Sequence, residues 1–301
     1  MSDHSELAEA LLDAPVGVAL LARLDPDGIG AAAVDGLSFG QLLHVALDAA
    51  WSLAGPWTPG APAALAEAWR SAADRRAVAS AVAARFGEEL LAPIDPARQE
   101  WWTTASATAP AAGGAPRPFV DHDQVYGNGE FTWAGRWTVT APPAEVHDAL
   151  IAAWELFPPP VVRRRLPVRR PVRVHEVHGP DDWVELVRRY PARARGPHAG
   201  WELPGPNQHD EEIAPLLAVG GQRAVRTQVR HHLLPDWVAI ARELDGVHLS
   251  WAGFLTCEGR VVDLGDGDVT MLRYWASERT LWLHDVFDPA EPLPAPGLAA
   301  G

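Results

Sequence analysis

Hydrophobic residues near the C-terminus fall in short runs rich in Val, Leu, Thr, Trp and Tyr, and turn-forming dipeptides separate these runs. The dipeptides are Glu258-Gly259, Asp266-Gly267 and Ser277-Glu278. Loops this short join neighbouring antiparallel strands. The pattern therefore predicts a C-terminal four-strand antiparallel meander, with strands over 247–257, 260–264, 269–275 and 280–287.

Apolar residues in the first third of the chain recur at helical spacing instead. They predict a small bundle of helices within residues 4–102, at about 5–12, 41–54, 62–73 and 76–91. Between 103 and 118, small residues, proline and glycine replace this periodicity.

The change in composition predicts a division of the chain. We interpret 1–102 as a helical region, 103–118 as a linker and 119–288 as an α+β domain, so the predicted fold class is α+β. The remaining segment, 289–301, has little apolar bulk and is predicted to be a disordered tail. Inside the domain the pattern predicts a strand at 172–177 and helices after Pro142-Pro143, at 183–190 and at 237–244.

The pentapeptide Gly36-Leu37-Ser38-Phe39-Gly40 admits two interpretations. It matches the G-x-S-x-G nucleophile elbow of serine hydrolases, which requires a strand before it and a helix after it. Ser38, followed three residues later by Gln41, also forms a capping-box pattern at the start of an apolar helix. Only a weak apolar run precedes the motif and no HGGG-type segment occurs, so the capping box is the preferred interpretation.

Charge and residue usage narrow the range of functions. The net charge of −14 disfavours general binding to nucleic acids, because phosphate backbones attract a positive field. All 25 basic residues are arginine, and the absence of lysine excludes phosphate-loop, pyridoxal Schiff-base and kinase chemistry. No apolar run reaches the ~20 residues of a membrane span, and the acidic N-terminus does not resemble a signal peptide. We expect a cytoplasmic protein that does not bind membranes, and the abundance of Ala, Pro, Gly and Arg indicates a GC-rich bacterial genome.

The single cysteine, Cys257, excludes an intrachain disulfide and a metal site built from thiolates. Its position at the end of a predicted strand favours a small buried side chain over a nucleophile. The histidines and the Asp263, Asp266 and Asp268 group do not follow zinc or calcium spacings, so no metal site is predicted.

A cluster of arginines is the first candidate for chemistry. Guanidinium groups bind carboxylate or phosphate through paired hydrogen bonds, so the cluster could hold an anionic metabolite, a nucleotide or an acidic peptide. The alternative is a solvated loop that the acidic residues of the protein neutralise. The candidate anion-binding residues, called the arginine belt below, are Arg163, Arg164, Arg165, Arg169 and Arg170.

The second candidate is the tetrapeptide His175-Glu176-Val177-His178. On a strand, Glu176 and His178 share one face while His175 points the other way. A carboxylate beside an imidazole is suited to acid–base chemistry, so Glu176 and His178, with His232 elsewhere in the chain, are the candidate catalytic residues.

Two functional hypotheses follow. The first is a binding or interaction protein, with a protein partner held by the arginine belt and by some of the 14 tryptophans. The alternative is an enzyme that acts on an anionic or nucleotide-like small molecule by His/Glu acid–base chemistry, with a NAD-using transferase as one example. The sequence assigns no cofactor. The enzyme hypothesis requires Glu176, His178 and some of the arginines to converge in one pocket.

Overall fold

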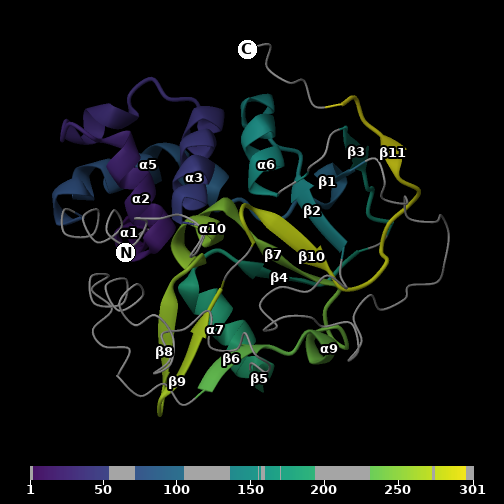
Figure 1. Cartoon of the computed structure of the whole chain (residues 1–301). Helices are drawn as coiled ribbons and strands as arrows, with labels where there is room; N and C mark the ends of the chain where they lie inside the picture. The colour runs from purple at the N-terminus through teal and green to yellow at the C-terminus, as the bar shows by residue number, and fades with distance from the viewer. Residues whose placement is uncertain are drawn as a thin grey trace.

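The computed structural model describes residues 3–53, 72–104, 136–154, 156, 160–169, 171–193, 231–272 and 275–295. Within these residues the protein has an α+β fold, which confirms the predicted class. Helices from the N-terminal part of the chain lie together, and two β-sheets lie beside them (Figure 1). No helix in the described ranges is long and apolar enough to cross a membrane.

The N-terminal helices pack through buried Leu, Val and Ala side chains into the main hydrophobic core. Helices at 5–12, 41–54 and 76–91 are confirmed, whereas α2 was not predicted. Pro15 occupies the first turn of α2, where its missing N–H costs no hydrogen bond. The helices are α1 (Asp3–Asp13), α2 (Pro15–Leu24), α3 (Phe39–Leu53) and α5 (Arg76–Leu90).

The start of α3 confirms the capping box. The Ser38 backbone N–H donates to Gln41 Oε1 at 2.8 Å, and the Gln41 N–H donates to Ser38 Oγ at 3.1 Å. Ser38 therefore satisfies backbone groups at a helix terminus, as the preferred interpretation of the pentapeptide requires.

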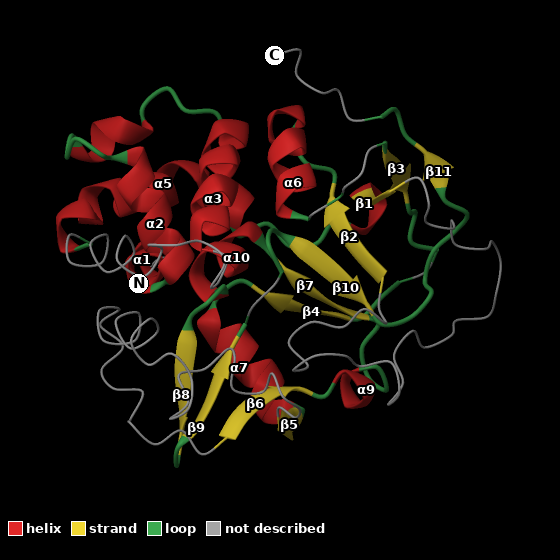
Figure 2. Ribbon diagram, in the orientation of Figure 1, coloured by secondary structure: helices red, strands yellow, loops and turns green. Residues whose placement is uncertain are grey.

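Seven strands form the larger sheet, which is antiparallel except for the parallel pair β4–β7. In spatial order the strands are β11 (Glu291–Pro292), β3 (Val161–Arg165), β1 (Gln99–Thr104), β2 (Arg136–Thr140), β10 (Arg279–Trp282), β7 (Gly246–Leu249) and β4 (Val174–Val177). The smaller sheet has the order β5 (Pro191–Arg193), β6 (His231–Pro235), β9 (Asp268–Met271) and β8 (Val261–Gly265). Figure 2 shows the two sheets in different parts of the molecule.

The larger sheet has two differently packed faces. One face joins the main core, together with α6 (His147–Ala153) and the N-terminal helices, through residues such as Val139 and Leu281. The other face carries a smaller apolar cluster that includes Trp282 and Phe287. A row of buried polar side chains also lies on this second face, and it includes Thr138, Thr280 and His248.

Helix α7 (Pro180–Arg189) contacts strands of both sheets, and Trp183 on it is buried. It confirms the helix predicted at 183–190, and α6 confirms the helix predicted after Pro142-Pro143. Helix α9 (Trp237–Ile240) is shorter than the predicted 237–244. Strand β4 confirms the strand predicted at 172–177.

The predicted four-strand meander is wrong. Its second and third strands do form an antiparallel hairpin, β8–β9, turned by Asp266 and Gly267 with positive φ. The first predicted strand instead splits into β7 and helix α10 (Trp251–Cys257), and β7 pairs with β10 and β4 in the larger sheet. The split occurs at Ser250, whose Oγ accepts a hydrogen bond from Gly253 N at 3.1 Å and caps the helix. Because α10 is buried on all sides, its sequence has no hydrophobic period that distinguishes a helix from a strand.

Several other strands were not predicted, among them β1 and β3. β1 lies in a segment whose pattern predicted helices, and β3 carries three arginines of the belt where a loop was one interpretation. Strand β11, which lies in the segment expected to be a disordered tail, pairs with β3 and forms the edge of the sheet. Most of the predicted helix at 62–73 and most of the linker lie outside the described residues, so the division of the chain stays a prediction.

Candidate acid–base site

Glu176 and His178 come together on the second face of the larger sheet, as the alternation along β4 predicted. The Glu176 Oε2 and His178 Nε2 atoms are 4.0 Å apart. The parallel register of β4 and β7 places His248 directly beside Glu176, with His248 Nε2 3.8 Å from the same Oε2 atom. One carboxylate oxygen is therefore flanked by two imidazoles from two adjacent strands.

The other oxygen of Glu176 fixes the carboxyl group in place. Oε1 accepts a hydrogen bond from the Ile94 backbone N–H at 3.2 Å, whereas the buried Oε2 has no hydrogen-bond partner among the described residues. The side chain is 26% exposed. Burial raises the pKa of Glu176 to about 7, although the Ile94 hydrogen bond opposes this shift, and nearby Asp182 adds to it.

His178 stands at the junction of β4 and α7. Asp182, in the first turn of α7, accepts hydrogen bonds from the backbone N–H groups of His178 at 2.8 Å and Gly179 at 3.0 Å. The imidazole is 30% exposed, and its Nδ1 is buried without a hydrogen-bond partner in the described part of the chain. Burial lowers the pKa of His178, so the neutral imidazole predominates near pH 7.

Two residues that the sequence did not single out extend the site into the protein interior. His248 Nδ1 lies 3.0 Å from Thr280 Oγ1 and 3.6 Å from Glu278 Oε1. Burial lowers the pKa of His248 to about 3 and raises the pKa of Glu278 to about 8. Glu278 accepts hydrogen bonds from the Thr140 backbone N–H at 3.2 Å. We call Glu176, His178, His248 and Glu278 the acid–base cluster.

The remaining histidine candidates lie elsewhere. His175 points to the opposite face from Glu176, and its Nε2 lies 3.0 Å from the Asp182 carbonyl oxygen. His232 belongs to β6 in the smaller sheet, and its side chain lies outside the described residues. The sequence therefore identified two members of the acid–base cluster.

The three belt arginines on β3 are far from Glu176 on β4. β3 and β4 are separated by β1, β2, β10 and β7, which corresponds to about 24 Å along the sheet at ~4.8 Å per strand. Arg163 forms a bidentate ion pair with Glu100, with hydrogen bonds of 2.8–3.1 Å. The exposed Arg165 lies 3.9 Å from Glu291.

The other belt members differ in their surroundings. Arg169 donates a hydrogen bond to the Asp285 carbonyl oxygen at 2.6 Å. Arg164 is half-buried on the opposite face of β3 from Arg163, and Arg170 lies outside the described residues. The structure thus brings Glu176 and His178 together but does not bring the belt arginines on β3 to them.

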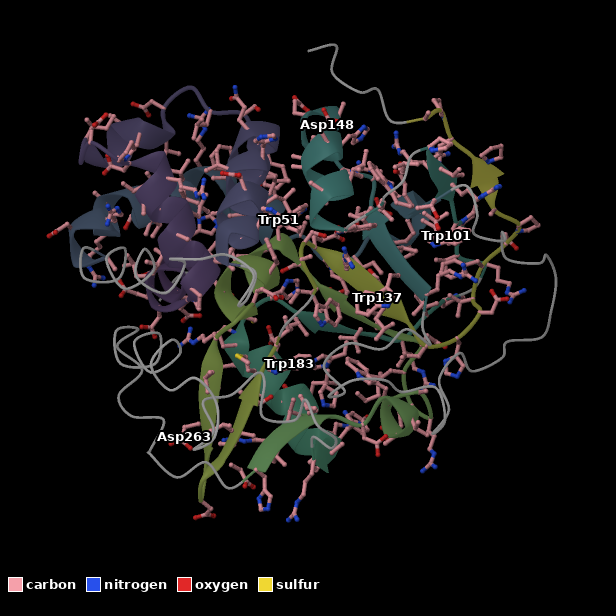
Figure 3. All side chains as sticks on the ribbon, in the orientation of Figure 1. Trp51, Trp101, Trp137, Asp148, Trp183 and Asp263 are labelled. Atoms are coloured by element: carbon pink, nitrogen blue, oxygen red, sulfur yellow. The ribbon has the colours of Figure 1, made fainter. Side chains whose placement is uncertain are left out.

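Most described tryptophans belong to the core. Trp102, Trp183, Trp237, Trp251, Trp275 and Trp282 are buried. Trp51 on α3 is an exception, because 49% of its surface is exposed (Figure 3). Within the described residues, core packing therefore accounts for most of the tryptophans.

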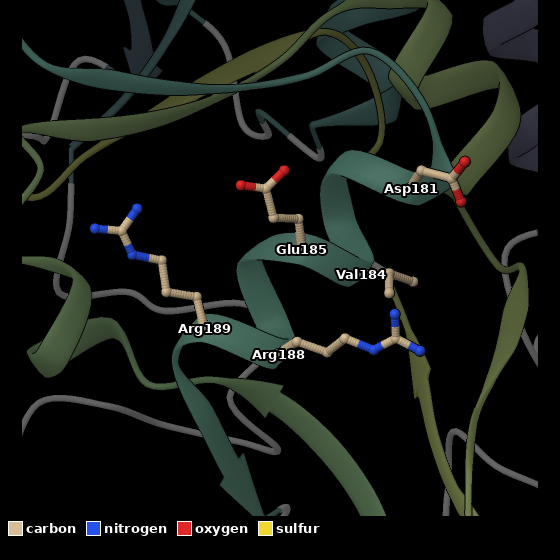
Figure 4. Close-up of a pocket in the computed structure, with 5 residues that line it drawn as sticks. All are labelled: Asp181, Val184, Glu185, Arg188 and Arg189. Atoms are coloured by element: carbon tan, nitrogen blue, oxygen red, sulfur yellow. The ribbon is translucent and has the colours of Figure 1, made fainter.

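A shallow depression of about 510 Å³ lies over the outer face of α7. Figure 4 shows its lining, which consists of Asp181, Val184, Glu185, Arg188 and Arg189. Arg189 also forms an ion pair with Glu243 at 2.5 Å. The lining contains none of the candidate catalytic residues, and it is an exposed charged helix surface rather than an enclosed site.

A cysteine nucleophile and a metal site have less support from the described residues. Cys257 is fully buried, and burial raises the pKa of its thiol, so the reactive thiolate is disfavoured. The described ranges contain no group of three or more His, Cys, Asp or Glu side chains arranged to hold a metal ion.

Comparisons with protein-family models, with curated proteins and with solved structures found no match. The function must therefore be inferred from the geometry of the residues themselves.

Proposed function

We propose that the protein is an enzyme that transfers protons to and from a bound small molecule, with Glu176 as the general acid–base and His178 as its partner. The observation that supports this proposal is the position of Glu176 Oε2, which lacks a hydrogen-bond partner within the described residues and lies between two imidazole nitrogens. A structural carboxylate at this depth would be expected to use both oxygens in hydrogen bonds.

The electrostatics of Glu176 suit proton transfer near neutral pH. A general acid–base works best when its pKa lies close to the working pH, since both protonation states are then populated. Burial brings the pKa of Glu176 to about 7 while a quarter of its side chain stays exposed to solvent. His178 is partly exposed beside Glu176, so its imidazole can orient a substrate or exchange a proton with it.

The proposed substrate is a small molecule with an exchangeable proton, which is a broader class than the anionic or nucleotide-like molecule expected from the sequence. An anionic or nucleotide-like substrate, and a NAD-using transferase in particular, would need cationic groups near Glu176. The belt arginines on β3 lie several strands away from β4, so an anion bound at Glu176 would not reach them. A small molecule with an exchangeable O–H or C–H proton, or a water that attacks such a molecule, fits the carboxyl and imidazole groups better.

The interaction-protein hypothesis has less support. Arg163 and Arg169 are engaged by groups of the protein itself, and most described tryptophans are buried. Among the described residues, the exposed Arg165 and Trp51 are the ones that stay available to a protein partner.

The test begins with thermal unfolding against a panel of nucleotides, phosphorylated metabolites and neutral small molecules. A ligand at a hundred times its dissociation constant stabilises the folded state by about 2.7 kcal/mol, which shifts the unfolding temperature visibly. Turnover of any ligand that binds is then measured with Glu176→Gln and with Glu88→Gln, an exposed control on α5. We expect Glu176→Gln to keep binding and to lose about 10²–10⁴-fold in kcat. Full turnover in Glu176→Gln would refute the proposal.

A further inference from the structure

We propose that His248 and Glu278 form a buried proton relay that exchanges the proton of Glu176 with the protein interior. This inference rests on the proposed acid–base role of Glu176 and extends it to two residues that no substrate needs to touch. It is carried by the spatial order of the side chains, since the two ring nitrogens of His248 face two different carboxyl groups. Nε2 faces Glu176 at 3.8 Å, and Nδ1 faces Glu278 at 3.6 Å.

Burial increases sharply between Glu176 and the other two members of this path. The side chain of Glu176 is partly exposed, whereas His248 and Glu278 are 1% and 2% exposed. A proton that enters at Glu176 therefore travels inward, away from water. A structural network would have no need to end in an ionisable carboxyl group with so little solvent.

The groups around each member hold it in position. His248 is oriented by Thr280 Oγ1 at 3.0 Å from Nδ1, and the Thr280 hydroxyl can donate or accept. Glu278 accepts from the Thr140 N–H. The Ile94 N–H lowers the pKa of Glu176 through its hydrogen bond, and the Asp182 charge raises it. His178 lies near both Glu176 and His248.

One more charged residue adjoins the buried end of the path. Arg279 follows Glu278 in sequence and favours its ionised form. The Arg279 guanidinium itself extends to the opposite sheet face, where its central carbon lies 3.9 Å from the centroid of the Trp154 ring. It therefore biases the relay electrostatically without lying between the two carboxyl groups.

The transfer is balanced and needs no other reactant. When Glu176 gives up its proton, its O–H bond breaks and an N–H bond forms at His248 Nε2. The N–H bond at Nδ1 breaks in turn, and an O–H bond forms on ionised Glu278. The imidazole changes tautomer and stays neutral, and one proton has moved from Glu176 to Glu278.

The two carboxyl groups have comparable proton affinity, which makes this exchange reversible. Their pKa values are about 7 and about 8, and both reflect burial first. The imidazole stays neutral because its pKa is about 3. The distances of 3.6 and 3.8 Å exceed a direct hydrogen bond, so each transfer requires a small side-chain rotation or one bridging water.

Nitrogen-15 NMR of the His248 ring tests the relay without a substrate, because ring nitrogen shifts distinguish the two neutral tautomers from the imidazolium. In the wild type we expect the tautomer ratio to change in two steps, near pH 7 and near pH 8, while the ring stays neutral. Glu176→Gln should remove the step near pH 7, and Glu278→Gln should remove the step near pH 8. Glu88→Gln, at an exposed position on α5 outside the cluster, is the matched control and should keep both steps.

The possible outcomes separate the relay from the proposed function. A single His248 tautomer from about pH 5 to about pH 10, or steps that survive in both variants, would overturn the relay. The wild-type pH series alone decides this if a variant does not fold. Loss of turnover in Glu176→Gln together with a fixed tautomer would retain the proposed function and reject the relay. Two steps together with full turnover in Glu176→Gln would reject the proposed function, and with it the catalytic use of the relay.

Discussion

Arg163 and Glu100 are joined across β3 and β1 by a bidentate ion pair that is largely shielded from water, with side chains 13% and 6% exposed. The same carboxylate accepts a hydrogen bond from Trp102 Nε1 at 2.9 Å, and the Arg163 guanidinium lies 4.9 Å from the centroid of the Trp102 ring. This arginine, which the sequence offered as an anion ligand, already has its anion inside the protein. It therefore supports the alternative in which acidic residues of the chain neutralise the belt.

Replacing Arg163 should destabilise the fold severely. Arg163→Gln leaves the Glu100 carboxylate buried without its cation, and breaking a buried pair in this way costs about 3–5 kcal/mol in the free energy of unfolding. Denaturant unfolding followed by tryptophan fluorescence measures this loss. Arg165→Gln on the same strand is the control, since its contact with Glu291 is exposed and should contribute less than about 1 kcal/mol. Equal, small losses in both variants would contradict the structural role of Arg163.

A second prediction concerns the close approach of α10 to β4. A Cβ atom on Gly253 would lie 2.1 Å from the Val177 carbonyl oxygen and 2.7 Å from Leu249 Cδ1, so the backbone would have to move. We expect Gly253→Ala to lower the free energy of unfolding by about 3 kcal/mol. Gly179→Ala, where no atom lies within 4 Å of the added Cβ, should cost at most about 1 kcal/mol in the same denaturation experiment. A tolerated Gly253→Ala would show that the helix does not pack this closely.

The pH dependence of stability provides a third prediction. The folded-state pKa of Glu278 is about 8 against an ordinary value of 4.5, so the folded protein holds this proton more tightly than the unfolded chain. Its stabilising effect is complete below about pH 4.5 and is lost as the pH rises to about 8. Glu278→Gln mimics the protonated form, so its unfolding free energy relative to the wild type should rise by roughly 2–5 kcal/mol as the pH increases from about 5 to about 9.

The measurement is a set of denaturant-unfolding curves at several pH values, with Glu88→Gln on α5 as an exposed control for the substitution itself. The quantity compared is the difference in unfolding free energy between each variant and the wild type. If this difference for Glu278→Gln were the same at all pH values, the buried carboxyl would not be protonated in the folded state at neutral pH.

The sequence predicted local features better than long-range pairing. The alternation along β4 correctly placed Glu176 and His178 on one face, and the Ser38–Gln41 spacing correctly predicted a helix cap. Both depend only on residues a few positions apart. His248 and Glu278 were missed because their contacts come from the pairing of β7 with β4 and β10, which are distant in sequence. The predicted meander assigned β7 a different neighbour and so concealed the cluster.

The strands around the arginine belt were missed for a different reason. In β3 the alternate inward position is filled by Arg163, and in β1 by Glu100, so the buried face does not look apolar in the sequence. Only the mutual neutralisation of these two side chains makes the burial possible. A signal was present in the form of an isolated Glu before two tryptophans, but it becomes meaningful only when its partner strand is known.

A fourth prediction concerns acid denaturation and His248. Burial holds the folded-state pKa of this imidazole at about 3, whereas the unfolded chain binds a proton near pH 6.5, so its contribution to stability is present above pH 6.5 and is lost as the pH falls toward 3. His248→Gln removes this loss. The free energy of unfolding of the variant should therefore increase relative to that of the wild type as the pH decreases through this range. The lost contact with Thr280 adds only an offset that does not depend on pH. His44→Gln, at an exposed position on α3, controls for removing a histidine as such. A difference between His248→Gln and the wild type that stays constant from about pH 7 to about pH 4 would mean that His248 reaches solvent and takes up protons in the folded protein, which contradicts its place in a buried relay.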